Sequence, residues 1–313
     1  MKYYFAPLEG LTDSIYRRHH HQYFPGISRY YMPFLSPTIH RTLTHKEDRE
    51  LPLADSVPFT AVPQILTRDP EAFLWAAEQC ALRGYSEVNL NIGCPSGTVV
   101  AKGKGAGMLS DTGALDKFLD RICSGSPLPV SVKTRVGVND TDALPRLVEI
   151  YNAHPISELI VHPRTRKDFY TGPIRQDAFR YVLNHYRGKL CYNGDITSPT
   201  QAEAVLSRCP GVNNLMVGRG LIADPGMFTP GGTEADTLHR FHDHLLEEYS
   251  IAFGSARNAM FRMKEHWHYL GPRFQGSEKL LKQLRKTTDL SQFRSITTQI
   301  FQTLPRNSWG TSE

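Results

Sequence analysis

The sequence predicts an α/β fold in which a barrel of eight parallel strands is followed by a smaller all-helical domain. Two patterns lead to this prediction. Short apolar runs alternate with helical patterns as far as Val217, in units of roughly 30 residues. From residue 234 to residue 302 only helical spacing occurs. We therefore assign residues 1–228 to a (β/α)8 TIM barrel and residues 229–313 to a helical C-terminal domain, divided within the Pro- and Gly-rich segment Pro225–Gly232.

Strands are predicted where short runs of apolar, β-branched and aromatic residues end at Gly, Pro or Asn. One of them carries Val88, Leu90 and Ile92 in alternation with polar residues and ends at Gly93-Cys94-Pro95. The other seven are Lys2–Phe5, Ile27–Phe34, Ala61–Leu66, Pro129–Val136, Glu158–His162, Lys189–Asn193 and Asn213–Val217.

Helices are predicted between these strands from apolar residues at helical spacing. Thr12 or Asp13 can cap the first helix, which carries Ile15, Tyr16 and Arg17. The later helices are Pro70–Leu82, Thr112–Ile122, Asp142–Asn152, Gln176–His185 and Pro199–Leu206. Residues 38–58 are polar and irregular, and we expect them to form a loop over the barrel rim.

Composition and cysteine spacing exclude several classes of protein. The 313 residues contain no run of about 18 or more apolar residues, so no membrane span is expected. The N-terminal run MKYYFAPLEG lacks the apolar core of a secretion signal. The five cysteines show no CxxC spacing, which favours a reducing cytoplasm over a disulfide framework and gives no sign of a metal site.

Positive charge is concentrated near the C-terminus. Residues 254–306 carry ten basic and three acidic side chains, or +10 − 3 = +7, whereas the rest of the chain is +5 − 7 = −2. This asymmetry suggests a nucleic-acid contact, although a solvated helical surface would show the same pattern. The basic residues are Arg257, Arg262, Lys264, Arg273, Lys279, Lys282, Arg285, Lys286, Arg294 and Arg306.

Cys94 lies where a predicted strand ends and a glycine-rich segment begins. The segment contains Gly97, Gly103, Gly105 and Gly107, and glycines allow mobility and close backbone approach to a ligand. The carboxyl ends of barrel strands form the active-site rim, so Cys94 is a candidate catalytic residue. Its position alone is equally compatible with a small buried side chain before a turn.

Polar side chains also end most of the other predicted strands, and in a barrel they converge on that rim. Two glycine-rich loops, Asn193-Gly194-Asp195 and Gly218-Arg219-Gly220, follow the seventh and eighth strands, where such barrels usually bind phosphate. Exposed backbone N–H groups and the Arg219 fork suit phosphate oxygens. The rim set comprises Pro7, Gln64, Asn91, Cys94, Lys133, Arg135, His162, Arg164, Asn193, Asp195 and Arg219.

Several motifs occur in a fixed order between residues 6 and 220. They are APLEGLTD at 6–13, Gln64, NIGCP at 91–95 followed by Gly103, Gly105 and Met108-Leu109, SVKTRVG at 131–137, VHPRT at 161–165, NGDI at 193–196 and MVGRG at 216–220. On these motifs the chain resembles the bacterial tRNA-dihydrouridine synthases, flavin enzymes that reduce uridine in tRNA. The basic helical tail is similar in length and character to the RNA-binding domain of that family.

The resemblance implies an FMN cofactor reduced by NADPH, and uridine in tRNA as the substrate. It implies that Cys94 protonates C5 of the uracil while hydride reaches C6; a thiol of ordinary pKa, about 8.5, is mostly protonated at neutral pH and can act as an acid. The residues expected to bind FMN are Pro7, Leu8, Glu9, Gln64, Lys133, His162, Asn193, Gly194, Asp195, Gly218 and Arg219. Those expected to bind the substrate are Asn91, Arg135, Arg257, Arg262, Lys264 and Arg285.

Three other functions remain open from the residues alone. An aldolase-type lyase would use Lys133 as a Schiff-base amine in the same fold. A small-molecule FMN oxidoreductase would share the phosphate loops but has no use for a basic tail. A non-catalytic RNA-binding protein would keep the tail but would be neither yellow nor active. We favour the tRNA enzyme, and expect a monomeric cytoplasmic protein that binds tRNA but neither metal nor membrane.

Overall fold

The computed structural model describes residues 1–38 and 40–306. It divides into two compact units. The first contains Met1–Pro7, Ser28–Asp195 and Val205–Met216, and the second contains Leu8–Ile27, Ile196–Ala204 and the chain from Val217 onward. The predicted division at residues 228 and 229 into a catalytic domain and a tRNA-binding domain stays a prediction.

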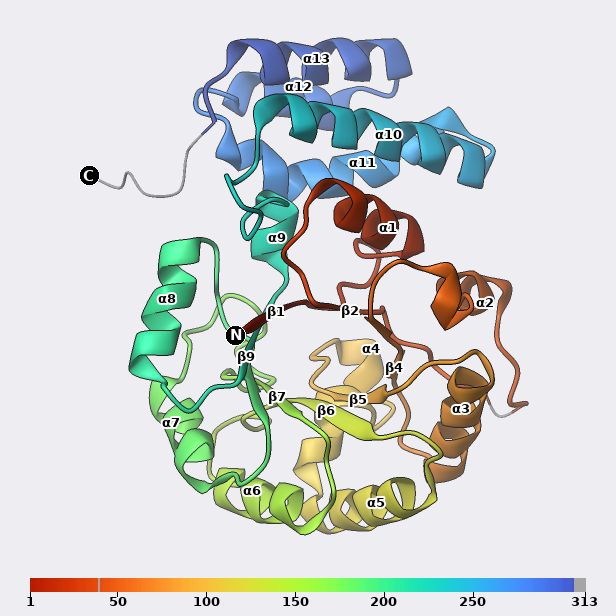
Figure 1. Ribbon diagram of the computed structural model, residues 1–313, viewed down its shortest axis with the longest axis vertical. Helices are drawn as coiled ribbons and strands as arrows, with labels where there is room; N and C mark the ends of the chain where they lie inside the picture. The colour runs from red at the N-terminus through yellow and green to blue at the C-terminus, as the bar shows by residue number, and fades with distance from the viewer. Residues whose placement is uncertain (39, 307–313) are drawn as a thin grey trace. The chain divides into compact units, whose positions relative to one another are not determined.

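The strands form one sheet that curls into a barrel (Figure 1), and the strand pairs within the described residues run parallel. The predicted TIM-barrel class is thus confirmed. The strand order around the sheet is β3-β2-β1-β9-β8-β7-β6-β5-β4. The strands are β1 (Lys2–Phe5), β2 (Arg29–Tyr31), β3 (Ala61–Val62), β4 (Gln64–Ile65), β5 (Val88–Ile92), β6 (Val130–Arg135), β7 (Leu159–His162), β8 (Leu190–Tyr192) and β9 (Asn214–Val217).

The third predicted strand, Ala61–Leu66, is divided in the structure, which is why nine strands replace eight. Pro63 has no N–H to donate to a ladder, so β3 and β4 end on either side of it. Val62 pairs with Tyr31 of β2, whereas Gln64 pairs with Asn89 of β5. The two halves of one extended segment therefore join the two ends of the sheet.

The helices of the first unit cover the outside of the strands (Figure 1). α3 matches its predicted bounds because Asp69 accepts hydrogen bonds from the first-turn N–H groups and Pro70 opens the helix. The helical segments of the first unit are α2 (His45–Glu50), η1 (Ala54–Ser56), α3 (Pro70–Leu82), α4 (Gly97–Val100), η2 (Gly105–Ser110), α5 (Thr112–Gly125), α6 (Leu144–Ala153), α7 (Gln176–His185) and α8 (Pro199–Arg208). The last of them, α8, is divided between the two units.

Three segments expected to be irregular loops contain helical turns. Within residues 38–58, Thr44 and Glu47 form a capping box that starts α2. The glycine-rich segment after Cys94 forms the short helical segments α4 and η2. Of the loop expected at Gly218-Arg219-Gly220, only Gly218 lies outside a helix, because α9 begins at Arg219.

The barrel interior is apolar along one part of the sheet and polar along another. Seven buried side chains, six from six strands and Ala6 just after β1, fill the apolar part: Tyr4, Ala6, Tyr31, Val62, Ile160, Cys191 and Met216. On β5 and β6 the interior positions carry amide, hydroxyl and cationic side chains instead, and these are described with the site below. A filled apolar layer blocks the barrel, so a ligand has room only near its rim.

The second unit is helical. Its first helix comes from the N-terminal part of the chain, where Asp13 caps α1 as predicted. Tyr16 of α1 packs edge-on against Phe241 of α10, with ring centroids 5.6 Å apart. The helices are α1 (Ser14–Tyr23), α9 (Arg219–Ala223), α10 (Ala235–Phe253), α11 (Ala256–Leu270), η3 (Gly271–Arg273), α12 (Glu278–Lys286) and α13 (Leu290–Thr303). None of the helices in the described ranges is long and apolar enough to cross a membrane.

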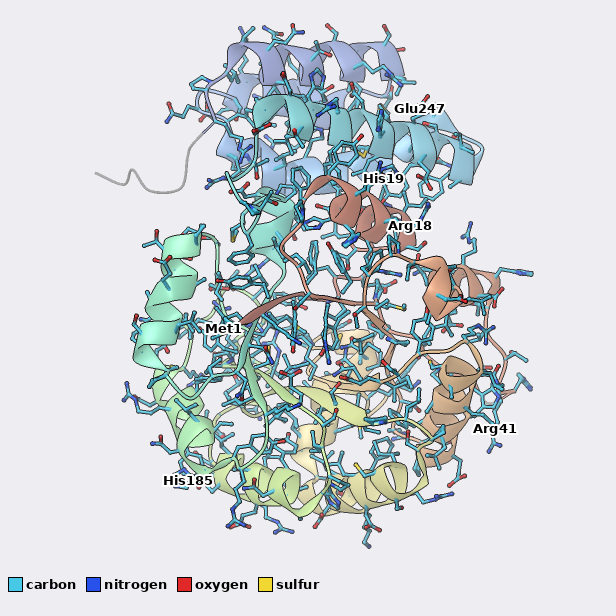
Figure 2. The ribbon with its side chains drawn as sticks, viewed as in Figure 1. Met1, Arg18, His19, Arg41, His185 and Glu247 are labelled. Atoms are coloured by element: carbon cyan, nitrogen blue, oxygen red, sulfur yellow. The ribbon has the colours of Figure 1, made fainter. Side chains whose placement is uncertain are left out.

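Histidines pack α1 against its neighbours in this unit. Arg18 and His19 project from α1 (Figure 2), and both bind the carboxylate of Glu248 on α10. Deeper in the unit, His266 stacks on Tyr16 at 4.8 Å, and its Nε2 atom lies 3.0 Å from the Leu11 carbonyl oxygen. Burial lowers the pKa of His266 to about 4, and that of His20 to about 3.

These histidines make the helical unit sensitive to acid. A lowered pKa means that the folded state resists protonation, so stability is unaffected above pH 6.5 and falls as the unfolded chain takes up protons below it. We expect the buried His266 to reduce the free energy of unfolding by about 2 kcal/mol between about pH 6.5 and about pH 5. Urea unfolding of the His266→Gln variant should lose that part of the pH dependence.

The matched control is His268→Gln, an exposed position on the same helix. Its pH dependence should equal that of the parent protein. If both variants keep the full loss of stability in acid, His266 is not the group that titrates.

Candidate active site

The polar interior face begins with a chain of hydrogen bonds across three neighbouring strands. The Gln64 amide on β4 donates to Asn89 Oδ1 on β5 at 2.8 Å, and Asn89 Nδ2 donates to Ser131 Oγ on β6 at 2.9 Å. Ser131 Oγ in turn donates to the Val88 carbonyl at 3.4 Å. Gln64, Asn89 and Ser131 are all fully buried. Each side chain both donates and accepts, so the orientation of every amide is determined by its neighbours.

This chain of bonds ends at the Cys94 turn. Asn91 Nδ2 donates to Gln64 Oε1 at 2.7 Å, which leaves Asn91 Oδ1 facing the backbone ahead. Asn91 Oδ1 accepts from the N–H of Gly93 at 3.0 Å and from that of Cys94 at 2.9 Å. We call the set Val88, Ser131, Asn89, Gln64, Asn91 and the Cys94 turn the amide ladder. It determines where β5 ends and therefore where Cys94 lies.

Three further contacts hold the turn. Arg135 Nε donates to the Gly93 carbonyl at 2.8 Å, and the Ala106 N–H donates to the Cys94 carbonyl at 3.0 Å. Gly105 has φ +57°, and a Cβ there would lie 2.8 Å from the Cys94 carbonyl oxygen and 3.1 Å from its Cβ. Glycine is therefore required at this approach, and Cys94 remains half-buried beneath η2.

Arg135 was expected to bind substrate, and its guanidinium is engaged within the protein. Besides Gly93, it donates to the carbonyl oxygens of Thr165 at 2.8 Å and Phe169 at 2.7 Å. It therefore links the turn after β5 to the loop after β7. Its role as a substrate ligand stays a prediction.

Lys133 lies between Ser131 and Arg135 on the interior side of β6, because side chains alternate along a strand. The neighbouring Thr134 faces outward and lies 3.1 Å from the Tyr151 hydroxyl of α6. Burial, reinforced by the charge of Arg135, lowers the pKa of Lys133 to about 8. Among the hydrogen bonds and ion pairs of residues 1–38 and 40–306, none involves its ammonium group, which suits an anionic or carbonyl-bearing ligand.

Arg164 connects two residues that were expected to bind the cofactor. Its guanidinium forms a bidentate pair with Asp195, at 2.9 and 2.6 Å, and lies 3.1 Å from His162 Nε2. Since Arg164 can only donate, His162 Nε2 accepts, which leaves the Nδ1 proton on the neutral ring. The sequence motif included Arg164 but assigned it no role. The sequence feature that could have indicated a role for Arg164 is its position, two residues after a histidine at the end of a strand.

The glycine loops are built differently from each other. Asn193 Nδ2 donates to the Met216 carbonyl at 2.8 Å, so this side chain joins β8 to β9. A Cβ at Gly194 would lie 2.1 Å from the Tyr192 hydroxyl, which explains the glycine. Gly218 and Arg219 belong to the second unit together with Leu8 and Glu9, whereas Pro7 belongs to the first. The proposal that these residues share one cofactor therefore rests on the resemblance and not on a measured distance.

The four basic residues predicted to bind the substrate's backbone differ in their surroundings. Arg262 donates to the Gly10 carbonyl and to Glu265, and Lys264 donates to the carbonyl of Thr287 at the end of α12. Arg257 and Arg285 are exposed. Lys264 thus stabilises a helix terminus, which the charge count could not indicate.

No group of three or more His, Cys, Asp or Glu residues in the described part of the chain could hold a metal ion. Cys94 and Cys123 are the half-buried cysteines, and Cys80, Cys191 and Cys209 are buried.

The chain is similar to known proteins both in its fold and in its sequence. The fold is shared with morphinone reductase, which superposes with a TM-score of 0.51 at 11% identity, over 72% of this chain and 84% of that one. At that identity the likeness concerns the fold alone. The family model "Dihydrouridine synthase" matches residues 4–308.

The chain belongs to the dihydrouridine synthase family, and it is therefore an oxidoreductase. It is 28% identical to tRNA-dihydrouridine synthase B of Pasteurella multocida over 258 residues, which cover 82% of this chain and 73% of that protein. It is 27% identical to the protein of the same name from Vibrio parahaemolyticus over 275 residues, 86% of this chain and 82% of that one. This membership favours an oxidoreductase over the Schiff-base lyase.

Breaking the amide ladder at a distance from Cys94 should loosen the thiol. Asn89→Leu keeps the approximate volume but leaves Gln64 without its acceptor, and an unpaired buried amide costs about 1–3 kcal/mol. We expect alkylation of Cys94, followed by peptide mass spectrometry, to accelerate severalfold, while Cys123 reacts at the parent rate.

Thr134→Val is the matched control, because it removes a buried hydrogen bond from the outer face of the same sheet. It should leave the Cys94 rate unchanged. Equal Cys94 rates in the two variants would show that the ladder does not hold the turn.

Proposed function

We propose that the protein reduces specific uridines in tRNA to 5,6-dihydrouridine, with FMN as the cofactor and NADPH as the reductant. One observation carries the proposal: in a chain of the dihydrouridine synthase family, a thiol held by hydrogen bonds and a cation with no partner among the described residues lie at adjacent strands. Cys94 is held at the carboxyl end of β5, and Lys133 lies on the adjacent strand. The relatives named tRNA-dihydrouridine synthase B support tRNA as the substrate.

The residues of the first unit are compatible with a flavin. Lys133 offers a cation that forms no hydrogen bond or ion pair with residues 1–38 and 40–306, and His162 offers a ring whose tautomer Arg164 determines. Gln64 still has one amide proton and one lone pair beyond its two ladder bonds. We propose that Gln64, Lys133 and His162 hold the ring system, with Asn193, Gly194, Asp195, Gly218 and Arg219 near the phosphate and Pro7, Leu8 and Glu9 beside them. FMN, when bound, supplies the hydride that reaches uracil C6.

Cys94 supplies the proton. The ladder and Arg135 hold the backbone on both sides of the thiol, so the thiol presents its proton in one place. The thiol of Cys94 is the acid, and the Asn91 amide beside it would bind the nucleobase. Two such groups held in place suit the addition of a proton to uracil C5. Asn91 would orient the uracil through the atoms that the ladder leaves available, and its Oδ1 already sets the Cys94 turn.

The test separates the cofactor from the acid. Protein as isolated should release FMN, not FAD, on denaturation. Cys94→Ala should retain FMN and oxidise NADPH in the absence of RNA, but reduce tRNA uridine slower by on the order of 10²–10⁴-fold. Dihydrouridine in the tRNA is measured by mass spectrometry.

Cys123→Ala is the matched control and should reduce uridine at the parent rate, because Cys123 lies on α5. Near-normal uridine reduction by Cys94→Ala would remove that residue from the acid role. Release of FAD, or no flavin after reconstitution, would remove FMN. Borohydride trapping of Lys133 without flavin would instead support the lyase.

The second unit is proposed to bind tRNA through α12. Lys279, Lys282, Arg285 and Lys286 are exposed on this helix, whose apolar side includes the buried Leu284. Exposed cations on one helix suit contacts with phosphates, which position RNA without reading bases. Arg257 is exposed on α11 and would extend the same contact, whereas Arg262 and Lys264 are engaged in internal hydrogen bonds.

Charge reversal on α12 should weaken tRNA binding. For Lys279→Glu/Lys282→Glu/Lys286→Glu we expect a loss of roughly tenfold or more and a salt slope smaller by about two to three, since each lost contact releases about one counterion fewer. Filter binding over a range of salt concentrations measures both values.

The control reverses three exposed charges of the first unit, Lys117→Glu/Arg187→Glu/Lys189→Glu. It has the same change in net charge and should bind with nearly the parent slope. If both triple variants behave alike, net charge and not α12 governs binding.

A monomeric state and a cytoplasmic location remain predictions.

A further inference from the structure

The loop between β7 and α7 exposes two aromatic rings. Its sequence, TRKDFYTG at 165–172, places the aromatic pair Phe169-Tyr170 one residue after the basic pair Arg166-Lys167. Phe169 is 43% exposed and Tyr170 is 47% exposed, although large aromatic side chains are usually well buried. The loop follows the carboxyl end of β7, at the same edge of the sheet as the Cys94 turn after β5.

Phe169 has a strained backbone. Its φ is +48°, in the left-handed region that a bulky side chain rarely adopts. Such strain persists only where the surrounding structure enforces it, and it is concentrated at functional sites. An asparagine or glycine would adopt this conformation with less strain.

Three arginines enforce the conformation. Arg135 binds the carbonyl oxygens of Thr165 and Phe169, at 2.8 and 2.7 Å, and Arg164 Nε binds that of Gly172 at 2.6 Å. The third, Arg175, pairs with the carboxylate of Asp168 at 2.7 and 3.0 Å.

Asp168 completes the brace from within the loop. Its carboxylate accepts from the N–H and the hydroxyl of Thr165, both at 2.8 Å. Its hydrogen bond with Arg175 holds the pKa of Asp168 well below its usual range, so the carboxylate stays charged. The loop is rigidly built, and the consequence of its geometry is that Phe169 points outward.

The two rings have different neighbours. Tyr170 turns towards the polar face, with the Arg135 guanidinium 5.3 Å from its ring centroid and the His162 ring 6.4 Å away. Phe169 has the Arg166 guanidinium 5.7 Å from its centroid. Lys167, next in sequence, is exposed. The backbone N–H groups of Arg166 and Lys167 bind the carbonyls of Gly137 and Val138 at 2.9 Å, which tethers the basic pair to the segment after β6.

We propose that Phe169 is a stacking platform for an unpaired RNA base next to the target uridine, and that Arg166 and Lys167 contact the phosphates beside that base. This inference rests on the proposed tRNA substrate. Single-stranded RNA is bound by aromatic rings on which bases stack, together with cations that follow the backbone. A uridine drawn out of its stack leaves neighbours whose faces are uncovered, and a rigid exposed ring receives such a face without further ordering.

The first experiment measures uridine reduction by Phe169→Ala, Phe169→Leu and Phe169→Trp. Stacking predicts that the alanine and leucine variants lose roughly tenfold in kcat/KM, mainly through KM, while the tryptophan variant retains it. FMN content and NADPH oxidation without RNA should stay at parent values. Leu82→Ala, which truncates an exposed apolar side chain on α3, is the control and should behave as the parent. Equal activity of the leucine and tryptophan variants, or no loss with alanine, overturns the proposal.

The second experiment does not depend on turnover. In the Phe169→Trp variant of the full chain, a short single-stranded RNA should quench tryptophan emission saturably, and Leu82→Trp should show no such quenching. Absence of quenching at position 169 overturns the platform. If the parent protein reduces no tRNA uridine but quenching occurs, the proposed function fails and the RNA platform stands.

Strain provides an independent readout. Phe169→Gly should unfold at higher urea concentration than Phe169→Ala, because glycine accepts the positive φ, yet both should show the same loss in kcat/KM. If glycine lowers the urea midpoint below that of alanine, the loop does not strain residue 169, and the inference that it is built to present a ring is wrong.

Discussion

The hydrogen bonds of the amide ladder are the constraint on which the proposed site depends. All of these hydrogen bonds point the same way along the ladder. Each side chain accepts from the member nearer Cys94 and donates to the next one, from the N–H groups of the Cys94 turn to the Val88 carbonyl. All three strands that contribute are parallel neighbours, so the ladder exists only when their register is correct. A buried amide that loses its partner costs more than its hydrogen bond contributes, and the ladder therefore links correct barrel assembly to correct placement of the thiol.

Buried arginines perform a related task at the rim. Arg135 and Arg164 are almost fully buried, and they bind backbone carbonyl oxygens of the turn after β5 and the loop after β7. A guanidinium has five N–H donors in a fixed plane, so one side chain can bind several carbonyls from separate segments. These loops thereby become part of the rigid structure although they contain almost no regular elements. Only Arg164 also has a carboxylate partner in this network, Asp195.

The ionisable groups divide by unit. In the first unit the interior keeps charged groups because they have multiple hydrogen-bond donors or an expected anionic ligand. In the second unit burial holds His20 and His266 neutral, and both rings pack against Tyr16. Positive charge in that unit occurs both inside, where the buried Arg17 donates to the Thr12 carbonyl, and on exposed helical surface, as on α12.

The sequence by itself determined the barrel class, the bounds of α3 and α7, and the family, because strand alternation, helix caps and motifs are local properties. It could also have indicated Asn89 and Ser131, since each occupies the position two residues before an expected site residue on the same strand face. Only the tertiary structure decided that Pro63 divides a strand, that Lys264 binds the end of α12, and that Arg135 and Arg164 brace loops. The proline at position 63 was a local signal for a break, but the contacts of Lys264, Arg135 and Arg164 join residues distant in sequence, and a local pattern does not specify such partners.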